Sequence, residues 1–175
     1  MSKAPTYWKK ARTYLSKKDS IMRSLIKKYK DNNLTTRKDV FYSLCKSIIG
    51  QQISVAAADS VFKKFESACK KKINPKTVSK LKISQLKKCG LSRQKIRGIL
   101  EMSQKFKDKT FNPRLIPKMS DEEAIMYLST LRQIGRWSAE MILLFTYNRS
   151  NIWPVQDIGL LLSLIHISEP TRHRQ

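Results

Sequence analysis

Histidine, cysteine and long apolar runs are scarce in this chain, and each shortage excludes a class of protein. The 175 residues include two His and three Cys. Cys45, Cys69 and Cys89 are scattered, with no C-x-x-C pair and no His at ligand spacing, so the sequence predicts reduced thiols and no metal site. No apolar run is long enough to span a membrane, and residues 1–6 contain no apolar signal core. We therefore expect an intracellular protein.

Acidic residues are also few, which leaves the charge strongly one-sided. Lys and Arg number 36 against 13 Asp and Glu, for a formal net charge of +23. Such an excess favours a polyanionic partner, although a Lys-rich solvated surface is the alternative. Because no strongly amphipathic basic helix stands out, nucleic acid is favoured over a lipid surface. We expect a cytoplasmic, nucleoid-associated protein with no membrane partner, and we expect it to be a monomer.

Segments that alternate polar and apolar residues are rare, whereas apolar residues recur at helical spacing through most of the chain. The sequence therefore predicts an all-α fold, with one sizeable core or two small lobes that share a cleft. Ser120 and Glu123 form a capping box, and the Pro-containing stretch 112–117 is the longest break, predicted to cross between lobes. The predicted helices span residues 19–30, 38–50, 54–69, 75–81, 84–88, 92–107, 120–131 and 136–147.

Two features stand out as candidate functional groups. Residues 131–139 (LRQIGRWSA) form an apolar turn in which Gly135 opens directly into a helix, and Asp157 follows in the stretch WPVQDIG. The free N–H groups of such a helix start bind anions, and DNA phosphate is the obvious candidate. An ordinary loop with a helix behind it is the alternative.

The C-terminal residues form a separate segment. Residues 162–175 resemble the in-frame translation of a sequencing adapter, so we expect residues 1–161 to be an incomplete domain and residues 162–175 to be a non-native tail. His166 and His173 lie in that tail and are assigned no function. Loss of the last helices is expected to uncover apolar faces of the core.

Three motifs together resemble the helix-hairpin-helix superfamily of DNA glycosylases, and within it the DNA-3-methyladenine glycosylase II group. They are residues 47–57 (SIIGQQISVAA), residues 89–92 (CGLS) with the basic helix behind them, and residues 131–139 with Asp157. The resemblance covers roughly residues 38–161. It implies a two-lobed all-α domain that excises alkylated purines from double-stranded DNA by base flipping. Arg132 and Gln133 depart from the Pro and Gly that usually begin the family hairpin.

The resemblance also implies a DNA-binding role for the hairpin. Backbone amides around Ile134, Gly135 and Trp137 are the predicted phosphate donors, with Arg136 and Ser138 in the same segment. A monovalent cation is expected to share the phosphate, and no other cofactor is expected.

Trp137 is the most discriminating residue of the resemblance. Superfamily members that also cleave the DNA backbone carry Lys there, and an indole cannot form their Schiff base. We therefore expect a monofunctional glycosylase in which Trp137 packs against the flipped base, with a core Trp as the alternative. Met141, one helical turn further on, is expected to add polarisable packing in the pocket. Tyr147 and Trp153 are expected in the core.

Asp157 is the expected catalytic residue. A carboxylate beside the anomeric carbon stabilises an oxocarbenium-like transition state and activates water, and an N-alkylated purine leaves without a general acid. N-capping of the next helix is the alternative role. Gln51 and Gln52 are expected at the wedge tip that fills the gap left by the flipped base, or else they face solvent.

Two other functions stay open. One is a different superfamily glycosylase, for mismatched adenine or oxidised bases, which typically carries four Cys for an iron–sulfur cluster; Trp137 and residues 51–54 (QQIS) argue against it. The other is a non-catalytic DNA-binding module, in which a carboxylate at Asp157 would repel phosphate. The sequence does not distinguish among 3-methyladenine, 7-methylguanine, hypoxanthine and ethenoadenine as the preferred base.

Overall fold

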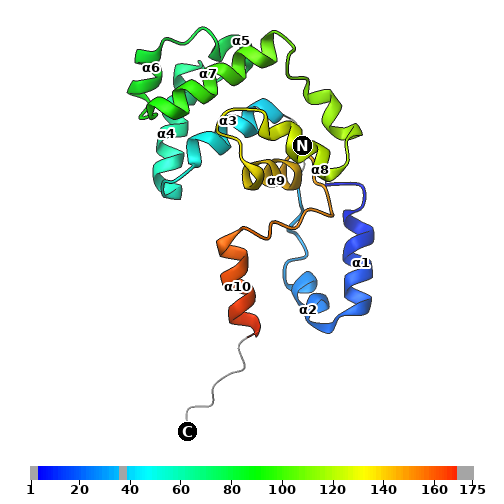
Figure 1. Ribbon diagram of the computed structural model, residues 1–175. Coiled ribbons are helices and arrows are strands. Elements are labelled where there is room, and N and C mark those ends of the chain that lie inside the picture. Colours follow the sequence, from blue (N-terminus) through cyan, green and yellow to red (C-terminus); the bar gives the residue numbers. More distant parts are fainter. Residues whose placement is uncertain (1–3, 36–38, 169–175) are drawn as a thin grey trace.

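The computed structural model describes residues 4–35 and 39–168, and every regular element in them is a helix (Figure 1). This confirms the all-α prediction. The elements are α1 (Trp8–Lys18), α2 (Ser20–Lys28), α3 (Val40–Gly50), α4 (Val55–Ala68), α5 (Pro75–Val78), α6 (Ile83–Lys88), α7 (Arg93–Lys107), the 3₁₀ helix η1 (Pro113–Lys118), α8 (Asp121–Ser129), α9 (Arg136–Phe145) and α10 (Ile158–Ser168).

The helix α3 is the centre of the molecule. It packs against α4 and α7 on one side and against α9 on the other, so both lobes share one continuous core. In Figure 1, α4 to α7 form the upper left part and α8 and α9 the part to the right of and below α3. Leu44, Cys45 and Ile48 are fully buried because the apolar residues of α3 surround most of the helix. The predicted two-lobed arrangement is therefore present.

Three tight turns join neighbouring helices in this core. Each contains one residue in the left-handed region: Gln52 (φ 56°) between α3 and α4, Gly90 (φ 94°) between α6 and α7, and Gln133 (φ 69°) between α8 and α9. The helices that follow two of these turns begin at the side-chain caps Ser54 and Ser92. The sharp turns place three helix starts on the surface.

Helix boundaries confirm most of the predictions and correct three. The Ser120–Glu123 capping box is present at the start of α8. The helix α1 was not predicted, because its apolar stripe packs only against α2 and is outnumbered by charged residues. The predicted helix 75–81 is the single turn α5, and the break at 112–117 contains η1, for which Pro113 supplies the fixed φ of a helix start.

Tyr7, Tyr147 and Trp153 differ in how they contact the core. Tyr7 anchors the N-terminal segment, since its hydroxyl donates to the carbonyl oxygen of Asn148 at 2.8 Å. Tyr147 is half-buried and packs against the core, as expected. Trp153 was expected in the core and is 62% exposed, because it lies in the extended stretch between α9 and α10, where no helix covers it.

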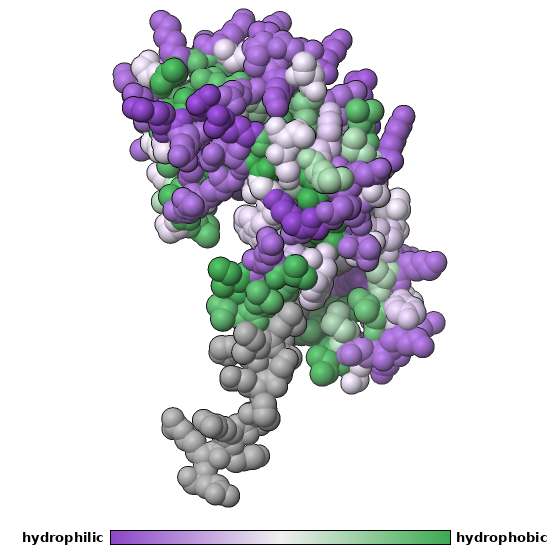
Figure 2. All heavy atoms as spheres, in the orientation of Figure 1, coloured by the Kyte–Doolittle hydropathy of each residue, from purple (hydrophilic) through white to green (hydrophobic). Residues whose placement is uncertain are grey.

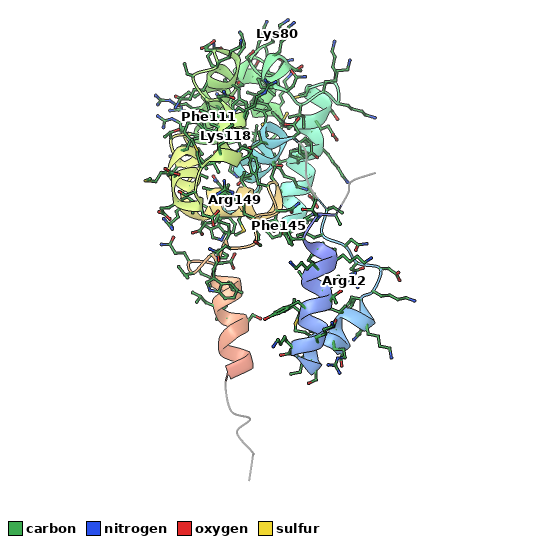
Figure 3. All side chains as sticks on the ribbon, turned by 90° about the vertical axis from the view of Figure 1, so that its right-hand side faces the viewer. Arg12, Lys80, Phe111, Lys118, Phe145 and Arg149 are labelled. Atoms are coloured by element: carbon green, nitrogen blue, oxygen red, sulfur yellow. The ribbon has the colours of Figure 1, made fainter. Side chains whose placement is uncertain are left out.

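The lower end of the molecule consists of α1, α2 and α10, which hang below the core in both Figure 1 and Figure 3. Ile158, Leu161 and Leu162 are exposed there, and Figure 2 shows the apolar surface that results. The helix α10 continues across the predicted domain boundary at residue 161. Residues 169–175 of the predicted tail, with His173, lie outside the described residues. No helix among the described residues is long and apolar enough to cross a membrane.

Candidate active site and DNA interface

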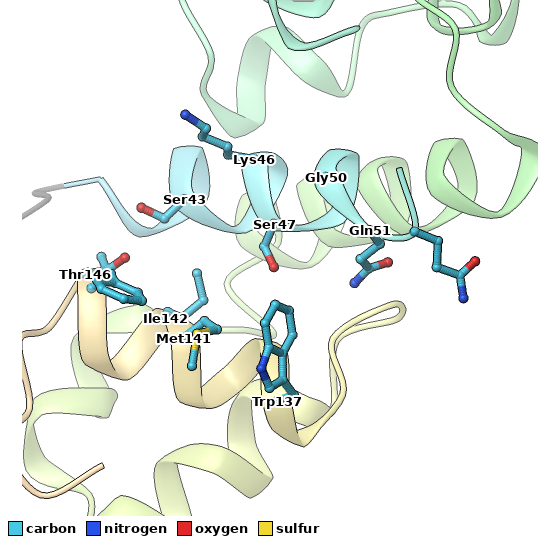
Figure 4. A pocket seen from close by; sticks show the side chains of 11 residues that line it. Ser43, Lys46, Ser47, Gly50, Gln51, Trp137, Met141, Ile142 and Thr146 are labelled. Atoms are coloured by element: carbon cyan, nitrogen blue, oxygen red, sulfur yellow. The ribbon is translucent and has the colours of Figure 1, made fainter. Parts of the chain in front are cut away.

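A pocket of about 520 Å³ lies between α3 and α9, where the two lobes meet (Figure 4). This volume is within the range of about 300–1,000 Å³ that is usual for small-molecule sites. The residues that line the pocket are Ser43, Lys46, Ser47, Gly50, Gln51, Gln52, Trp137, Met141, Ile142, Phe145 and Thr146.

One wall of the pocket is an apolar stripe on α9. Trp137, Met141 and Phe145 are four residues apart, so they lie on the same face of the helix. Trp137 is 42% exposed, and in Figure 4 its ring faces α3 across the pocket. The structure thus brings both predicted pocket residues, Trp137 and Met141, into one wall, although their contact with a base stays a prediction. Phe145 was missed, and its helical spacing from Trp137 is the signal that identifies it.

Asp157 lies beside this pocket, because it is hydrogen-bonded to Trp137 in the pocket wall. The indole Nε1 of Trp137 donates to Asp157 Oδ2 at 2.9 Å. The other oxygen, Oδ1, accepts the backbone N–H of Leu160 at 2.9 Å, so Asp157 caps the start of α10. The N-cap alternative is therefore confirmed. The catalytic role stays a prediction that the cap does not exclude, since the cap engages only one of the two oxygens.

The surroundings of Asp157 favour its anionic form. The backbone N–H of Leu160 lowers the pKa of this carboxyl most, and the N–H groups of Trp137 and Gly159 lower it further. The positive end of the α10 dipole acts in the same direction. Gly159 also leaves room for the carboxylate, since a Cβ atom there would lie 3.2 Å from Asp157 Oδ1. Asp157 is thus a carboxylate at neutral pH.

The hairpin between α8 and α9 presents backbone N–H groups at the surface. In the part of the chain that the structure describes, the N–H groups of Gly135, Arg136 and Trp137 have no protein acceptor. Gly135 has an ordinary φ of −90°, and a Cβ atom there would meet nothing within 4 Å. No contact inside the protein requires glycine at this position, so the absence of a side chain leaves the N–H groups open to a ligand.

Ile134 does not take part in this surface as predicted. Its N–H donates to the carbonyl oxygen of Leu131 at 3.0 Å and closes the turn, and its side chain is buried. The prediction that the Ile134 amide binds phosphate is therefore wrong. Ser138 is also buried, and only its backbone lies at the helix start.

The two hairpin arginines are paired with carboxylates. Arg136 donates to both oxygens of Glu122 at 2.5 and 2.8 Å, and its Nε lies 3.2 Å from Glu140. Glu122 is the main cause of a raised pKa of Arg136. Arg132 donates to Glu101 at 2.8 Å. Because the Arg136 side chain is engaged by carboxylates, only its backbone N–H is available for the predicted DNA contact.

The α3–α4 turn is tied to the hairpin through one side-chain amide. The Nε2 atom of Gln51 donates to the carbonyl oxygen of Gln133 at 2.7 Å and to Ser138 Oγ at 3.4 Å. Gln52 is exposed at the tip of the turn. Of the two predicted wedge residues, Gln51 holds the hairpin and Gln52 projects, so only Gln52 stays a wedge prediction.

The helix α7 braces both loops from behind. Lys95 Nζ donates to the carbonyl oxygens of Ile49 and Gln51 at 2.8 and 2.7 Å, and burial lowers its pKa. A Cβ atom at Gly98 would lie only 2.8 Å from Gln133 Cγ, so the α7 backbone approaches the hairpin closely. The sequence analysis missed Lys95, because nothing in its local sequence shows that it reaches the end of α3.

Among the described residues, no group of three or more His, Cys, Asp or Glu side chains could hold a metal ion. Cys45, Cys69 and Cys89 are free and buried, and burial raises the pKa of Cys69 to about 11. A monovalent cation at the hairpin would have to share carbonyl oxygens that already accept protein donors, including Thr130 O from Lys105 Nζ at 3.0 Å. The cation stays a prediction.

Comparison with known proteins agrees with the fold and the hairpin. Residues 45–172 match the family model described as HhH-GPD superfamily base excision DNA repair protein. The chain belongs to the HhH-GPD superfamily. This confirms the family that the three sequence motifs indicated.

Individual HhH-GPD relatives cover most of the chain. DNA-3-methyladenine glycosylase 1 of Schizosaccharomyces pombe is 28% identical, over 86% of this chain and 69% of its own length. The alkylbase DNA glycosidase-like protein mag2 of the same yeast is 31% identical, over 91% of this chain and 78% of its own. The crystal structure of DNA-3-methyladenine glycosidase from Bacillus halodurans is 25% identical with a TM-score of 0.71, over 77% of this chain and 62% of that one. This chain thus spans less than two thirds of the length of the bacterial glycosidase.

Proposed function

We propose that this chain is a monofunctional DNA glycosylase, of the DNA-3-methyladenine glycosylase II type, that hydrolyses the N-glycosidic bond of alkylated purines in double-stranded DNA. The observation that carries the proposal is the hydrogen bond from Trp137 Nε1 to Asp157 Oδ2, which joins an aromatic pocket wall to a carboxylate. The names of the relatives, two of which are 3-methyladenine glycosylases or glycosidases, support the same reaction.

The proposed reaction needs one carboxylate. A flipped N-alkylated purine enters the pocket with its cationic ring against Trp137, where the ring quadrupole stabilises positive charge by about 0.5–2 kcal/mol. As the glycosidic bond breaks, its electron pair leaves with the base, which departs neutral. Asp157 stabilises the positive charge that develops on the sugar and accepts a proton from the water that attacks the anomeric carbon.

An amine nucleophile is not part of this mechanism. Lys46 lies in the pocket lining, but its side chain points away from the pocket (Figure 4). Its Nζ atom lies over the ring of Phe62, 5.7 Å from the ring centroid. With Trp137 at the position where lyases carry their lysine, borohydride should trap no covalent complex between this protein and DNA.

DNA binding is proposed to use the hairpin and the α3–α4 turn. The N–H groups of Gly135, Arg136 and Trp137 bind one phosphate beside the flipped nucleotide, and Gln52 fills the gap in the base stack. The protein acts as a monomer on nucleoid DNA, in keeping with its charge of +23.

The decisive test is release of 3-methyladenine from methylated DNA by the protein and by Asp157→Asn. The amide keeps the size of the side chain but cannot neutralise the sugar cation, so release should fall at least about 100-fold. Asp59→Asn, an exposed carboxylate on α4, is the matched control and should act like the unaltered protein. Equal release by Asp157→Asn and the control would contradict the catalytic assignment, and binding with no release by any of the proteins would favour the non-catalytic module.

A further inference from the structure

The positive charge of this molecule is distributed unevenly along the chain. Residues 55–95, which contain α4, α5 and α6, carry twelve Lys and Arg against two acidic residues, Asp59 and Glu66. Residues 96–175, which contain the hairpin and Asp157, carry eleven against eight. The excess charge that would attract DNA therefore does not come from the segment that holds the hairpin.

The cations of the two regions also differ in their partners. The hairpin side chains Arg132 and Arg136 are held by carboxylates. By contrast, Lys63 and Lys64 on α4 and Lys87 and Lys88 on α6 are exposed, and none of them has an ion pair within the described residues. We call these four lysines the basic ridge. Their ammonium groups are available to anions without breaking an interaction inside the protein.

The basic ridge borders a groove. The helices α4 and α6 pack against each other, and the groove of about 570 Å³ between them is lined by Lys63, Lys64 and Lys88 with Ser67, Gln85 and Cys89. Figure 2 shows hydrophilic side chains over this part of the molecule, at the upper left.

The basic ridge is rigidly placed relative to the DNA-probing turn. The helix α4 begins just after Gln52, and eight residues at 1.5 Å each put Lys63 about 12 Å along its axis from Val55. The α6–α7 turn lies against α4, since a Cβ atom at Gly90 would be 3.4 Å from Val61, and Lys95 bonds this same unit to the α3–α4 turn.

We propose that the basic ridge is a second DNA-binding surface, which holds the phosphate backbone away from the flipped nucleotide. It supplies the electrostatic attraction that the carboxylate-paired arginines of the hairpin do not. The inference rests on the proposed function only in taking double-stranded DNA as the partner.

The test compares two variants with the same loss of charge. Lys63, Lys64, Lys87 and Lys88 are changed to Gln in one, and in the control the exposed α1 residues Lys9, Lys10, Lys17 and Lys18 are changed to Gln, at the opposite end of the molecule in Figures 1 and 3. Binding to an undamaged DNA duplex is measured between about 0.1 and 0.3 M salt, where exposed charges more than about 10 Å apart are screened.

The ridge variant should lower the steepness of log K against log salt by about 0.9 for each lost phosphate contact, or about 2 to 4 in all. The control should lower it by less than about 1. Equal changes in both variants, or no change in the ridge variant, would overturn the proposal. So would a ridge-dependent preference for an RNA duplex of the same sequence over DNA. If thermal melting shows the fourfold variant to be unfolded, the paired variants K63Q/K64Q and K87Q/K88Q carry the same comparison with half the expected change.

This experiment is independent of base release, because the duplex contains no lesion. If the unaltered protein releases no alkylated base while the salt slopes of the ridge and control variants still differ, the proposed reaction is contradicted and the role of the basic ridge in DNA binding is supported. If base release depends on Asp157 while the salt slopes of the two variants agree, the role of the basic ridge is contradicted and the proposed reaction is supported.

Discussion

Trp137 has two roles that a single substitution can separate. Its ring lines the pocket, and its N–H fixes Asp157 Oδ2 at 2.9 Å and lowers the pKa of that carboxyl. A phenylalanine keeps an aromatic wall but lacks the N–H donor, so it removes the positioning of the carboxylate and leaves most of the packing.

We predict that Trp137→Phe lowers the single-turnover rate of 3-methyladenine release by about tenfold, since a hydrogen bond to a charged group is worth about 1.5–3 kcal/mol. The pH below which the rate of base release falls should also change. A lowered pKa keeps Asp157 ionised until the pH falls through that lowered value, so the unaltered protein should hold its rate at least down to the usual aspartate pKa of about 3.9. In Trp137→Phe this fall should begin at higher pH. Trp153→Phe, at an exposed site, is the control, and equal profiles for the two variants would count against the positioning role.

Gly159 offers a substitution whose effects on stability and activity have opposite signs. Alanine in a helix is favoured over glycine by about 1 kcal/mol, so Gly159→Ala should stabilise α10. Its Cβ, however, would lie 3.2 Å from Asp157 Oδ1 and would displace the carboxylate. We predict an unchanged or higher melting temperature together with a severalfold slower release of base. An unchanged rate would show that the position of this oxygen does not matter to the reaction.

At the scale of elements, α7 holds the α3–α4 turn and the hairpin in one arrangement. Lys95 Nζ donates two hydrogen bonds to carbonyl oxygens at the end of α3, and its positive charge stabilises the negative end of the helix dipole there. Gln51 then connects that turn to Gln133 of the hairpin. The position of Gln51, which lines the pocket together with Trp137, is therefore supported by a side chain from a third helix.

We predict that Lys95→Met lowers the free energy of unfolding by about 2–3 kcal/mol, because two carbonyl oxygens lose a charged donor. It should also weaken binding to DNA, since the two loops proposed to contact DNA lose their common support. Urea unfolding and binding to a duplex measure the two effects. Lys107→Met, exposed on the same helix, should change the stability by less than about 0.5 kcal/mol, and a similar loss in both variants would argue against the brace.

The sequence predicted the elements of this fold better than the partners of single residues. Apolar periodicity located α2, α3, α4 and α6 to α9, and the turn chemistry of Gly135 located the start of α9. The sequence did not show that Ile134 closes the turn or that Arg136 is neutralised by Glu122, since both depend on atoms that the fold alone brings together. The same reason explains why Asp157 was expected to be either a cap or a catalyst, whereas the structure gives it a cap and a place beside the pocket.

At the scale of the whole molecule, α1 and α2 form a separate appendage. Neither helix contains a buried residue, they pack mainly against each other, and the buried apolar side chains of the core lie between Phe41 and Ile152. Among the described residues, the bond from Tyr7 to Asn148 is the long-range hydrogen bond that joins this appendage to the core. The appendage therefore adds charge to the molecule more than stability.

We predict that removal of residues 1–38 leaves a cooperative thermal transition and lowers the free energy of unfolding by about 1 kcal/mol, the value of one hydrogen bond. Circular dichroism melting of the shortened and full chains measures the difference. Loss of the cooperative transition would mean that the core depends on α1 and α2.

The bond between Trp137 and Asp157 has a consequence for observing the protein at work. An indole whose N–H is held by a carboxylate emits light differently from one that has lost its partner, and stacking against a base quenches that emission. The other two tryptophans, Trp8 and Trp153, lie outside the pocket lining. A chain in which both are replaced by phenylalanine would carry Trp137 as its single fluorescent reporter, hydrogen-bonded to Asp157 in the pocket wall. The proposed entry of a base and the protonation of Asp157 could then be followed in time without a label.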